Sequence, residues 1–135
     1  MRTILLLDDR EDVLAANVRL LRSLLPESEW RVATLSSSLQ AIIDISRRST
    51  AYDVVISDYM MPRHFGDEVV AVARRCSAKT FCILLSGTTG DAEKANQNLP
   101  EDHRAHHVVE KSPDAGIPRV VELIRARFAT PSPSP

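Results

Sequence analysis

The sequence predicts an α/β fold in which five helices cover a doubly wound, five-stranded parallel sheet. Short apolar runs alternate along the chain with amphipathic stretches, and this alternation favours parallel strands joined by right-handed crossovers. Residues 4–7, 54–56, 81–85 and 108–109 are apolar at successive positions, which is typical of strands buried on both faces. A weaker, alternating run at 30–35 suits an outer strand.

Five helices are expected in the segments that separate and follow these strands. The first ends before Pro26, the second is capped by the serines at 36–38, and the third begins at Gly66. A polar fourth helix is expected over 91–99. The fifth begins near the prolines at 113 and 118, and its apolar stripe consists of Ile117, Val121, Ile124 and Phe128.

Composition and charge narrow the classes of function. The hydrophobic fraction of 44% and the charged fraction of 26% are typical of a globular protein. A formal net charge of −1 gives no global basic field, so direct binding to nucleic acid is not expected. The apolar runs are too short to span a membrane, and Cys76 and Cys82 are too few for a disulfide framework. We therefore expect a cytoplasmic protein without membrane contact.

The length of 135 residues fits one domain, which we place at residues 1–129. Residues 130–135 alternate proline with serine after a threonine and suit neither a helix nor a strand. They are expected to form a disordered tail or the start of a linker. A stand-alone chain and a fragment cut before an output domain would look the same at this point.

Polar side chains follow four of the predicted strands at the position where each strand ends. Asp8 and Asp9 follow the first strand, Asp58 the third, Ser86 the fourth, and Lys111 the fifth after one glutamate. The carboxyl ends of parallel strands share one edge of an open sheet, where ligands bind at the point of reversed strand order. We therefore expect these five side chains to meet, although they lie up to a hundred residues apart.

Three neighbouring carboxylates would raise one another's pKa values unless positive charge compensates them. Lys111 and a hard divalent cation, Mg²⁺ or Mn²⁺, would balance the three acids, and such a cation also bridges to phosphate. The lysine can neutralise one phosphate oxygen, and the Ser86 hydroxyl can donate a hydrogen bond to another. The set predicts phosphoryl transfer to a carboxylate, with an acyl phosphate as the product.

These motifs, in this order, resemble the response-regulator receiver family of two-component signalling. The resemblance runs from about residue 3 to residue 128 and rests on the segments 5–9, 53–62, 84–87 and 110–111, with Gly66 eight places after Asp58. It implies a flavodoxin-like fold with the strand order 2-1-3-4-5. It also implies that the chain is a signalling receiver and not an enzyme, beyond accepting its own phosphoryl group and slowly hydrolysing it.

The resemblance assigns a role to each site residue. Asp58 would accept the phosphoryl group, Asp9 and Asp58 would bind the metal directly, Asp8 would act largely through water, and Met60 would offer its backbone carbonyl. The phosphate-binding and switch residues would be Ser86, Gly87 and Lys111. Met60 and Thr88 lie at positions that tune the lifetime of the phosphoryl group in this family.

The implied partners are a sensor histidine kinase or phosphotransfer protein and a downstream output partner or domain, and a homodimer is compatible with the family. An alternative is a receiver-like interaction module that acts without phosphorylation. Its basis is Val108 at the position of the family's switch aromatic and Ser112, instead of proline, directly after Lys111. A phosphohydrolase is disfavoured because Met60, and not a second acid, lies two residues after Asp58.

Two further features of the region before Lys111 are its histidines and its length. His107 could replace the missing aromatic if the register of the last strand shifted. The stretch from Leu99 to His107 is long for the family, and its histidines at 103, 106 and 107 lack obvious companions for a zinc site.

Overall fold

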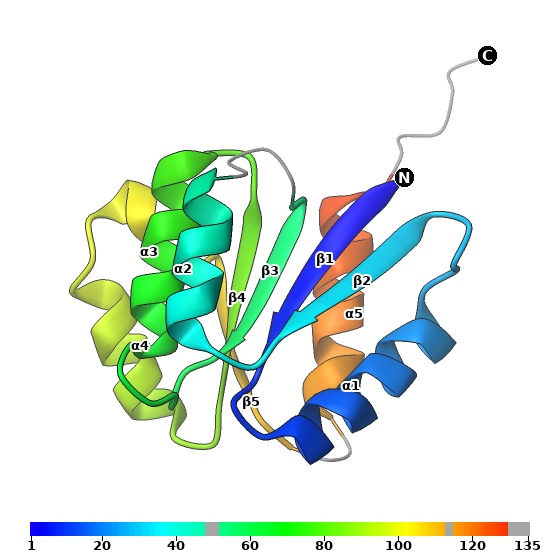
Figure 1. Ribbon diagram of the computed structural model, residues 1–135, viewed down its shortest axis with the longest axis horizontal. Coiled ribbons are helices and arrows are strands. Elements are labelled where there is room, and N and C mark those ends of the chain that lie inside the picture. The colour runs from blue at the N-terminus through cyan, green and yellow to red at the C-terminus, as the bar shows by residue number, and fades with distance from the viewer. Residues whose placement is uncertain (48–51, 113–114, 130–135) are drawn as a thin grey trace.

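Five parallel strands form one sheet in the order β2-β1-β3-β4-β5, which confirms the predicted fold class (Figure 1). The computed structural model describes residues 1–47, 52–112 and 115–129. The predicted tail at 130–135 and the proline at 113 lie outside these residues. The strands are β1 (Arg2–Leu7), β2 (Trp30–Leu35), β3 (Val54–Asp58), β4 (Phe81–Ser86) and β5 (His107–Glu110).

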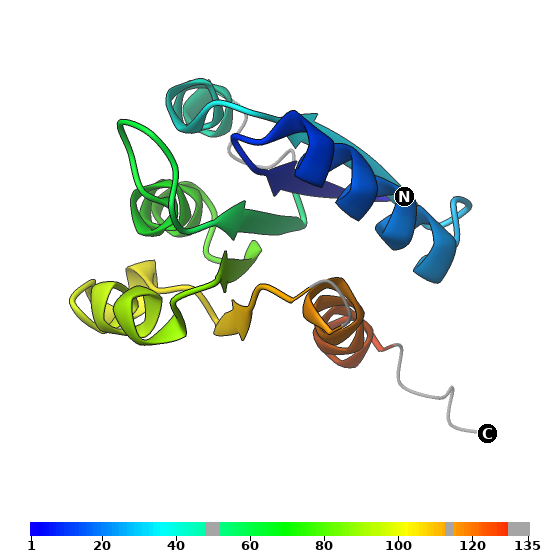
Figure 2. The same cartoon turned by 90° about the horizontal axis from the view of Figure 1, so that it is seen from below.

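Helices lie on both faces of this sheet, as Figure 2 shows from below. The helices are α1 (Glu11–Leu24), α2 (Ser38–Arg47), α3 (Gly66–Cys76), α4 (Thr89–Gln97) and α5 (Gly116–Arg127). The first and last helices pack on one face, and the other three pack on the opposite face. This is the doubly wound arrangement that alternating strands and helices produce.

The apolar runs of the sequence are explained by two separate cores. Along β1, Ile4 and Leu6 point to the α1 and α5 face, whereas Leu5 and Leu7 point to the α2 and α3 face. All four side chains are 0–1% exposed. A central strand of a parallel sheet therefore needs apolar residues at every position, because successive side chains enter different cores.

The outer strand β2 and the helix α2 follow the predicted pattern with small differences. The strand β2 lies at the edge of the sheet, as its alternating sequence predicts. Ser37 caps α2, since its hydroxyl accepts a hydrogen bond from the Gln40 amide at 3.2 Å. On this helix Ala41 and Ile45 face the sheet, whereas Leu39 remains 38% exposed.

The segment between α4 and β5 differs most from the expectation. The helix α4 begins at Thr89 and ends at Gln97, two residues earlier than predicted, and a 3₁₀ helix, η1 (Glu101–His103), follows. The guanidinium group of Arg104 donates hydrogen bonds to the carbonyls of Leu99 and Gln97, each at 2.9 Å. These bonds satisfy carbonyls at the helix end, so the long connection is folded against α4.

Two features are absent from the residues that the structure describes: a membrane-spanning helix and a cis peptide bond. No helix there combines the length and the apolar character that a membrane crossing requires. No cis peptide bond is present within the same ranges.

Candidate functional site

The site lies at the carboxyl edge of the sheet, between β1 and β3. These two strands flank the point at which the strand order reverses, because the chain adds β2 on one side of β1 and β3 on the other. The register places Leu7 beside Ser57 and Asp58 beside Leu85. Residues that follow these strands therefore project from a common level of the sheet.

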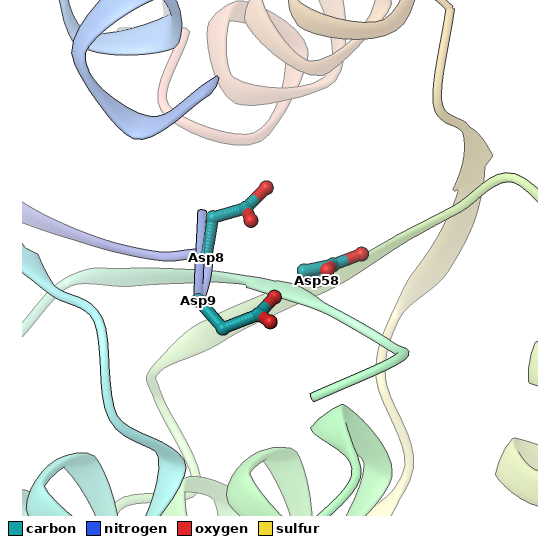
Figure 3. Close-up of side chains that lie close together, drawn as sticks. All are labelled: Asp8, Asp9 and Asp58. Carbon is teal, nitrogen blue, oxygen red and sulfur yellow. The ribbon is translucent and has the colours of Figure 1, made fainter. Parts of the chain in front are cut away.

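Three carboxylates gather at this edge, from the loop after β1 and from the end of β3 (Figure 3). Oxygen atoms of Asp8, Asp9 and Asp58 all lie within 4.8 Å of one another. Asp8 and Asp58 are only 2% and 6% exposed, whereas Asp9 is exposed to solvent. A set of carboxylate oxygens, one of them open to water, matches the preferences of Mg²⁺ and Mn²⁺.

Lys111 connects the acid cluster to the end of β5. Its Nζ atom donates a hydrogen bond to Asp8 Oδ2 at 2.6 Å and lies 3.4 Å from Asp58 Oδ1. The Lys111 amide donates to the carbonyl of Ser86 at 2.8 Å, which fixes the backbone from which the side chain extends. Burial lowers the pKa of the ammonium group, but Asp8 and Asp58 together outweigh that effect and raise it, so the group stays charged.

Burial raises the pKa of Asp58 from 3.8 to about 6. The charge of Lys111 lowers this pKa, whereas the neighbouring charges of Asp8 and Asp9 raise it. Near neutral pH the carboxylate is therefore mostly ionised and in contact with one ammonium group. An ionised carboxylate beside fixed positive charge is suited to attack an electrophilic phosphorus atom.

Asp8 is held at both of its oxygen atoms. Oδ1 accepts a hydrogen bond from the Arg10 amide at 3.0 Å, and Oδ2 accepts the bond from Lys111. Two donors, one on each oxygen of a buried carboxylate, fix its rotamer. Asp8 thus orients Lys111 toward Asp58.

Gly66 is required by the backbone of the acceptor strand. A Cβ atom added to Gly66 would lie 2.3 Å from the Asp58 carbonyl oxygen, a distance that no side chain tolerates. The Gly66 amide donates to the carbonyl of Tyr59 at 2.8 Å, and the Tyr59 amide donates to Leu85 at 2.8 Å. The glycine eight residues after Asp58 therefore allows α3 to begin directly against the site.

Ser86 and its neighbours lie at the end of β4. The Ser86 side chain is 1% exposed, and its Oγ atom accepts a hydrogen bond from the Thr88 amide at 2.9 Å. A second contact joins Ser86 Oγ to Thr88 Oγ1 at 3.2 Å. The hydroxyl expected to serve a phosphoryl group is thus bonded to Thr88. Gly87, also predicted for this site, is exposed in open space.

The partnership between Ser86 and Thr88 is a feature that the sequence did not predict. Serine followed two residues later by threonine is a weak signal for a local side-chain turn, because such residues often bond to nearby backbone groups. Met60, predicted to act through its carbonyl, has a side chain that is 55% exposed.

The register of β5 shows which residue occupies the position of the family's switch aromatic. Val108 pairs with Leu84 and packs in the core formed with α2 and α3. His107 lies on the other face, with its ring 5.7 Å from that of Phe81. The suggestion that His107 could replace the aromatic is therefore wrong. Within the described ranges, Asp8, Asp9 and Asp58 form the only group of three or more possible metal ligands, so the three histidines provide no zinc site there.

The strand order and the lysine-bridged acid cluster define a flavodoxin-like α/β protein with a carboxylate site that is compatible with a divalent cation. Residues 4–121 match the family model of the response regulator receiver domain. The chain therefore belongs to the receiver domains of two-component response regulators. Comparison with curated proteins gives no match.

Solved structures agree with this assignment. The response regulator protein TrrA from Thermotoga maritima, in complex with Mg²⁺-BeF, is 25% identical with a TM-score of 0.70, over 95% of this chain and 100% of that chain. A CheY-like receiver domain protein from Methanospirillum hungatei JF-1 is 16% identical with a TM-score of 0.75, over 94% and 93%. A receiver domain protein from Clostridium thermocellum is 22% identical with a TM-score of 0.74, over 95% and 94%. The last two similarities concern the fold alone.

Proposed function

We propose that the chain accepts a phosphoryl group on Asp58, with a bound Mg²⁺ or Mn²⁺ ion, and that this event switches partner binding. The observation that carries the proposal is the position of Lys111, whose Nζ atom contacts the carboxylates of both Asp8 and Asp58. A surface lysine would have no reason to be fixed between two buried acids. A site for phosphoryl transfer needs such fixed charge, because catalysis there consists mainly of positioning and neutralisation.

The donor set supports a division of labour among the acids. Both oxygens of Asp8 already accept hydrogen bonds, which favours contact with a metal through water. Asp9 and Asp58 would hold the ion directly, and the backbone carbonyl of Met60 would complete the protein ligands. When bound, the ion would offset carboxylate charge and that of the incoming phosphoryl group.

Asp58, Lys111 and Ser86 would each have a separate role in the transfer of the phosphoryl group. An Asp58 carboxylate oxygen attacks phosphorus as the bond from phosphorus to the donor atom breaks. Lys111 neutralises one phosphoryl oxygen from its place beside Asp58. Ser86 donates a hydrogen bond to another oxygen, for which its side chain must turn away from Thr88.

The proposal extends to partners and location. The donor would be a sensor histidine kinase or phosphotransfer protein, and an output partner or domain would read the phosphorylated state in the cytoplasm. The TrrA structure was determined with Mg²⁺-BeF, and beryllofluoride mimics a phosphoryl group, which supports the same chemistry here. We expect no multiple turnover on small phosphate esters, in contrast to an enzyme with an aspartyl intermediate.

Incubation with acetyl phosphate and Mg²⁺, followed by intact-mass measurement, tests the proposal. We expect a mass gain of one phosphoryl group for the wild-type chain and for the control Asp91→Asn, which changes an exposed aspartate. Asp58→Asn and removal of the metal by a chelator should both abolish the gain. A gain that survives Asp58→Asn, or no gain in any protein, would contradict the proposal.

Two observations favour the second candidate, a receiver-like module that acts without phosphorylation. Val108 occupies the position of the switch aromatic, and the Ser86 hydroxyl is bonded to Thr88. Under this reading, beryllofluoride with Mg²⁺ leaves the amide NMR spectrum and the affinity for the output partner unchanged. Under the first reading, amide resonances around Asp58, Ser86 and Lys111 shift.

A further inference from the structure

The hydroxyl group of Thr88 does not cap α4, although Thr88 directly precedes that helix. Thr88 directly precedes α4, in the N-cap position, where a threonine side chain usually accepts a hydrogen bond from the second or third amide of the helix. Here the Thr88 side chain makes no capping bond, and only its carbonyl accepts, from the amides of Asp91 at 3.1 Å and Ala92 at 3.2 Å. The hydroxyl contacts Ser86 Oγ at 3.2 Å instead.

Ser86 is held on its backbone but can turn at its side chain. Its carbonyl accepts the Lys111 amide at 2.8 Å, and its position in the sheet is paired with Glu110. Its side chain lies against Thr88, which is itself exposed, and Gly87 between them has nothing within 4 Å of an added Cβ atom. The bonds that fix Ser86 in the sheet involve its backbone and not its Oγ atom, so rotation of the side chain breaks none of them.

Either hydroxyl can be the donor in the contact between Ser86 and Thr88, so the exchange depends on geometry. A Ser86 side chain that rotates toward a phosphoryl group on Asp58 carries its Oγ atom away from the Thr88 hydroxyl. If Ser86 turns toward Asp58, the Thr88 hydroxyl loses its partner. The nearest donors for it are the amides at the start of α4, which the side chain of a threonine in the N-cap position can reach. One of them, the Asp91 amide, donates to the Thr88 carbonyl at rest and could share its proton with the hydroxyl.

We propose that Thr88 is a positioning residue whose hydroxyl exchanges partners: it holds Ser86 away from Asp58 in the resting chain, and it caps α4 once Ser86 binds the phosphoryl group. The inference rests on the proposed function, because it needs a ligand on Asp58 that attracts Ser86. It links the rotamer of one buried serine to the order of the first turn of α4. The beginning of α4 would thus report the state of the site.

Thr88→Val tests the exchange, because it removes the hydroxyl and keeps both the β-branched shape and the amide that bonds to Ser86. Thr88→Ser restores a hydroxyl and should behave as the wild type does. Thr89→Val removes the neighbouring hydroxyl and serves as the matched control. The affinity for beryllofluoride does not test the exchange well. Loss of the resting contact should raise that affinity, whereas loss of the cap should lower it.

NMR of the full chain measures the two halves of the exchange separately. In the resting protein, side-chain couplings of Ser86 should show one rotamer, and Thr88→Val should raise the second rotamer's population roughly two- to tenfold. On addition of beryllofluoride and Mg²⁺, hydrogen exchange of the Gly90 and Asp91 amides should slow roughly fivefold in the wild type and in Thr88→Ser. Thr88→Val should show no such slowing, and Thr89→Val should follow the wild type in both measurements.

Failure of the inference can be told apart from failure of the proposed function. If beryllofluoride binds and the amides of Gly90 and Asp91 slow equally in Thr88→Val, the exchange of partners is wrong. If beryllofluoride does not bind the wild type, the proposed function fails, and unchanged Ser86 rotamers in Thr88→Val would then overturn the resting contact as well.

Discussion

The two ends of the same sheet are built from opposite kinds of interaction. At the amino end, Trp30 and Phe128 pack edge to face with ring centroids 5.2 Å apart, and the Arg2 guanidinium lies 4.8 Å from the Phe128 ring. At the carboxyl end, two buried acids, Asp8 and Asp58, depend on one lysine. Aromatic packing stabilises the fold directly, whereas burial of carboxylates opposes folding unless charge compensates it.

The difference shows that stability and chemistry are separated along the strands. Apolar side chains that alternate between two cores hold the middle of the sheet, and the aromatic cluster closes its amino end. The carboxyl end carries the carboxylates and the lysine of the candidate site. Substitutions at the amino end should therefore change stability without changing chemistry, and those at the carboxyl end should change chemistry first.

Trp30→Ala should cause the largest loss of stability. The side chain is 8% exposed and packs against Phe128, so its removal should lower the unfolding free energy by about 3–5 kcal/mol. Urea unfolding followed by circular dichroism measures this, because Trp30 is the only tryptophan and its fluorescence is lost. While folded, the variant should still react with acetyl phosphate. Leu39→Ala, at a 38% exposed position, is the control and should change stability by no more than about 0.5 kcal/mol.

Asp58→Asn should stabilise the metal-free protein at neutral pH. Burial raises the folded-state pKa of Asp58 to about 6, above its ordinary value of 3.8, so the folded wild type binds more protons than the unfolded chain between these pH values. It therefore loses stability as pH rises through that window. Asparagine carries no such ionisation. The variant should be more stable than the wild type by about 1–3 kcal/mol at pH 8 and about equally stable near pH 4. Urea unfolding with chelator at both pH values measures this, and a wild type that gains stability relative to the variant as pH rises would contradict it.

Gly66→Ala should damage both stability and chemistry, because the position lies between the core and the site. The new methyl group would meet the Asp58 carbonyl oxygen, and the forced shift should cost about 1–3 kcal/mol and slow phosphorylation by acetyl phosphate. Gly90→Ala is the matched control, since an added Cβ there meets nothing within 4 Å inside α4. That change should stabilise the protein by about 0.5–1 kcal/mol. Equal effects of the two substitutions would refute the steric account.

Arg2→Met should have the smallest effect of the four. It removes the charge that lies over the rings of Phe128 and Trp30 but keeps a long apolar side chain. We expect a loss of about 0.5–1 kcal/mol and an unchanged rate of phosphorylation. Arg19→Met, on the exposed side of α1, is the comparison, and a loss there as large as in Arg2→Met would assign the effect to general charge.

The sequence predicted the sheet and the meeting of Asp8, Asp9, Asp58 and Lys111, because both follow from apolar runs and from the shared edge of parallel strands. The contacts of Lys111 and the clustering of the acids confirm that convergence. Their roles in metal binding and phosphoryl transfer stay predictions.

The sequence did not predict features that depend on local competition between hydrogen bonds. The Ser86 hydroxyl is bonded to the amide and the hydroxyl of Thr88, and the position of Ser86 at a strand end does not predict this contact. The 3₁₀ helix before β5 is followed by Arg104, whose side chain bonds to the carbonyls of Gln97 in α4 and of Leu99 just after it. Such bonds leave no periodic signal in the sequence. Leu39 is a separate case: this apolar residue is 38% exposed, whereas Ala41 and Ile45 of the same helix are buried.

Locating the acyl phosphate chemically is the most direct measurement of whether Asp58 is the acceptor. Borohydride reduces an aspartyl phosphate to homoserine, which peptide mass spectrometry places in the sequence. After treatment with acetyl phosphate and Mg²⁺, homoserine should appear at position 58 alone and should be missing when the metal is chelated. Homoserine at position 8 or 9, or an equal yield without metal, would contradict the account.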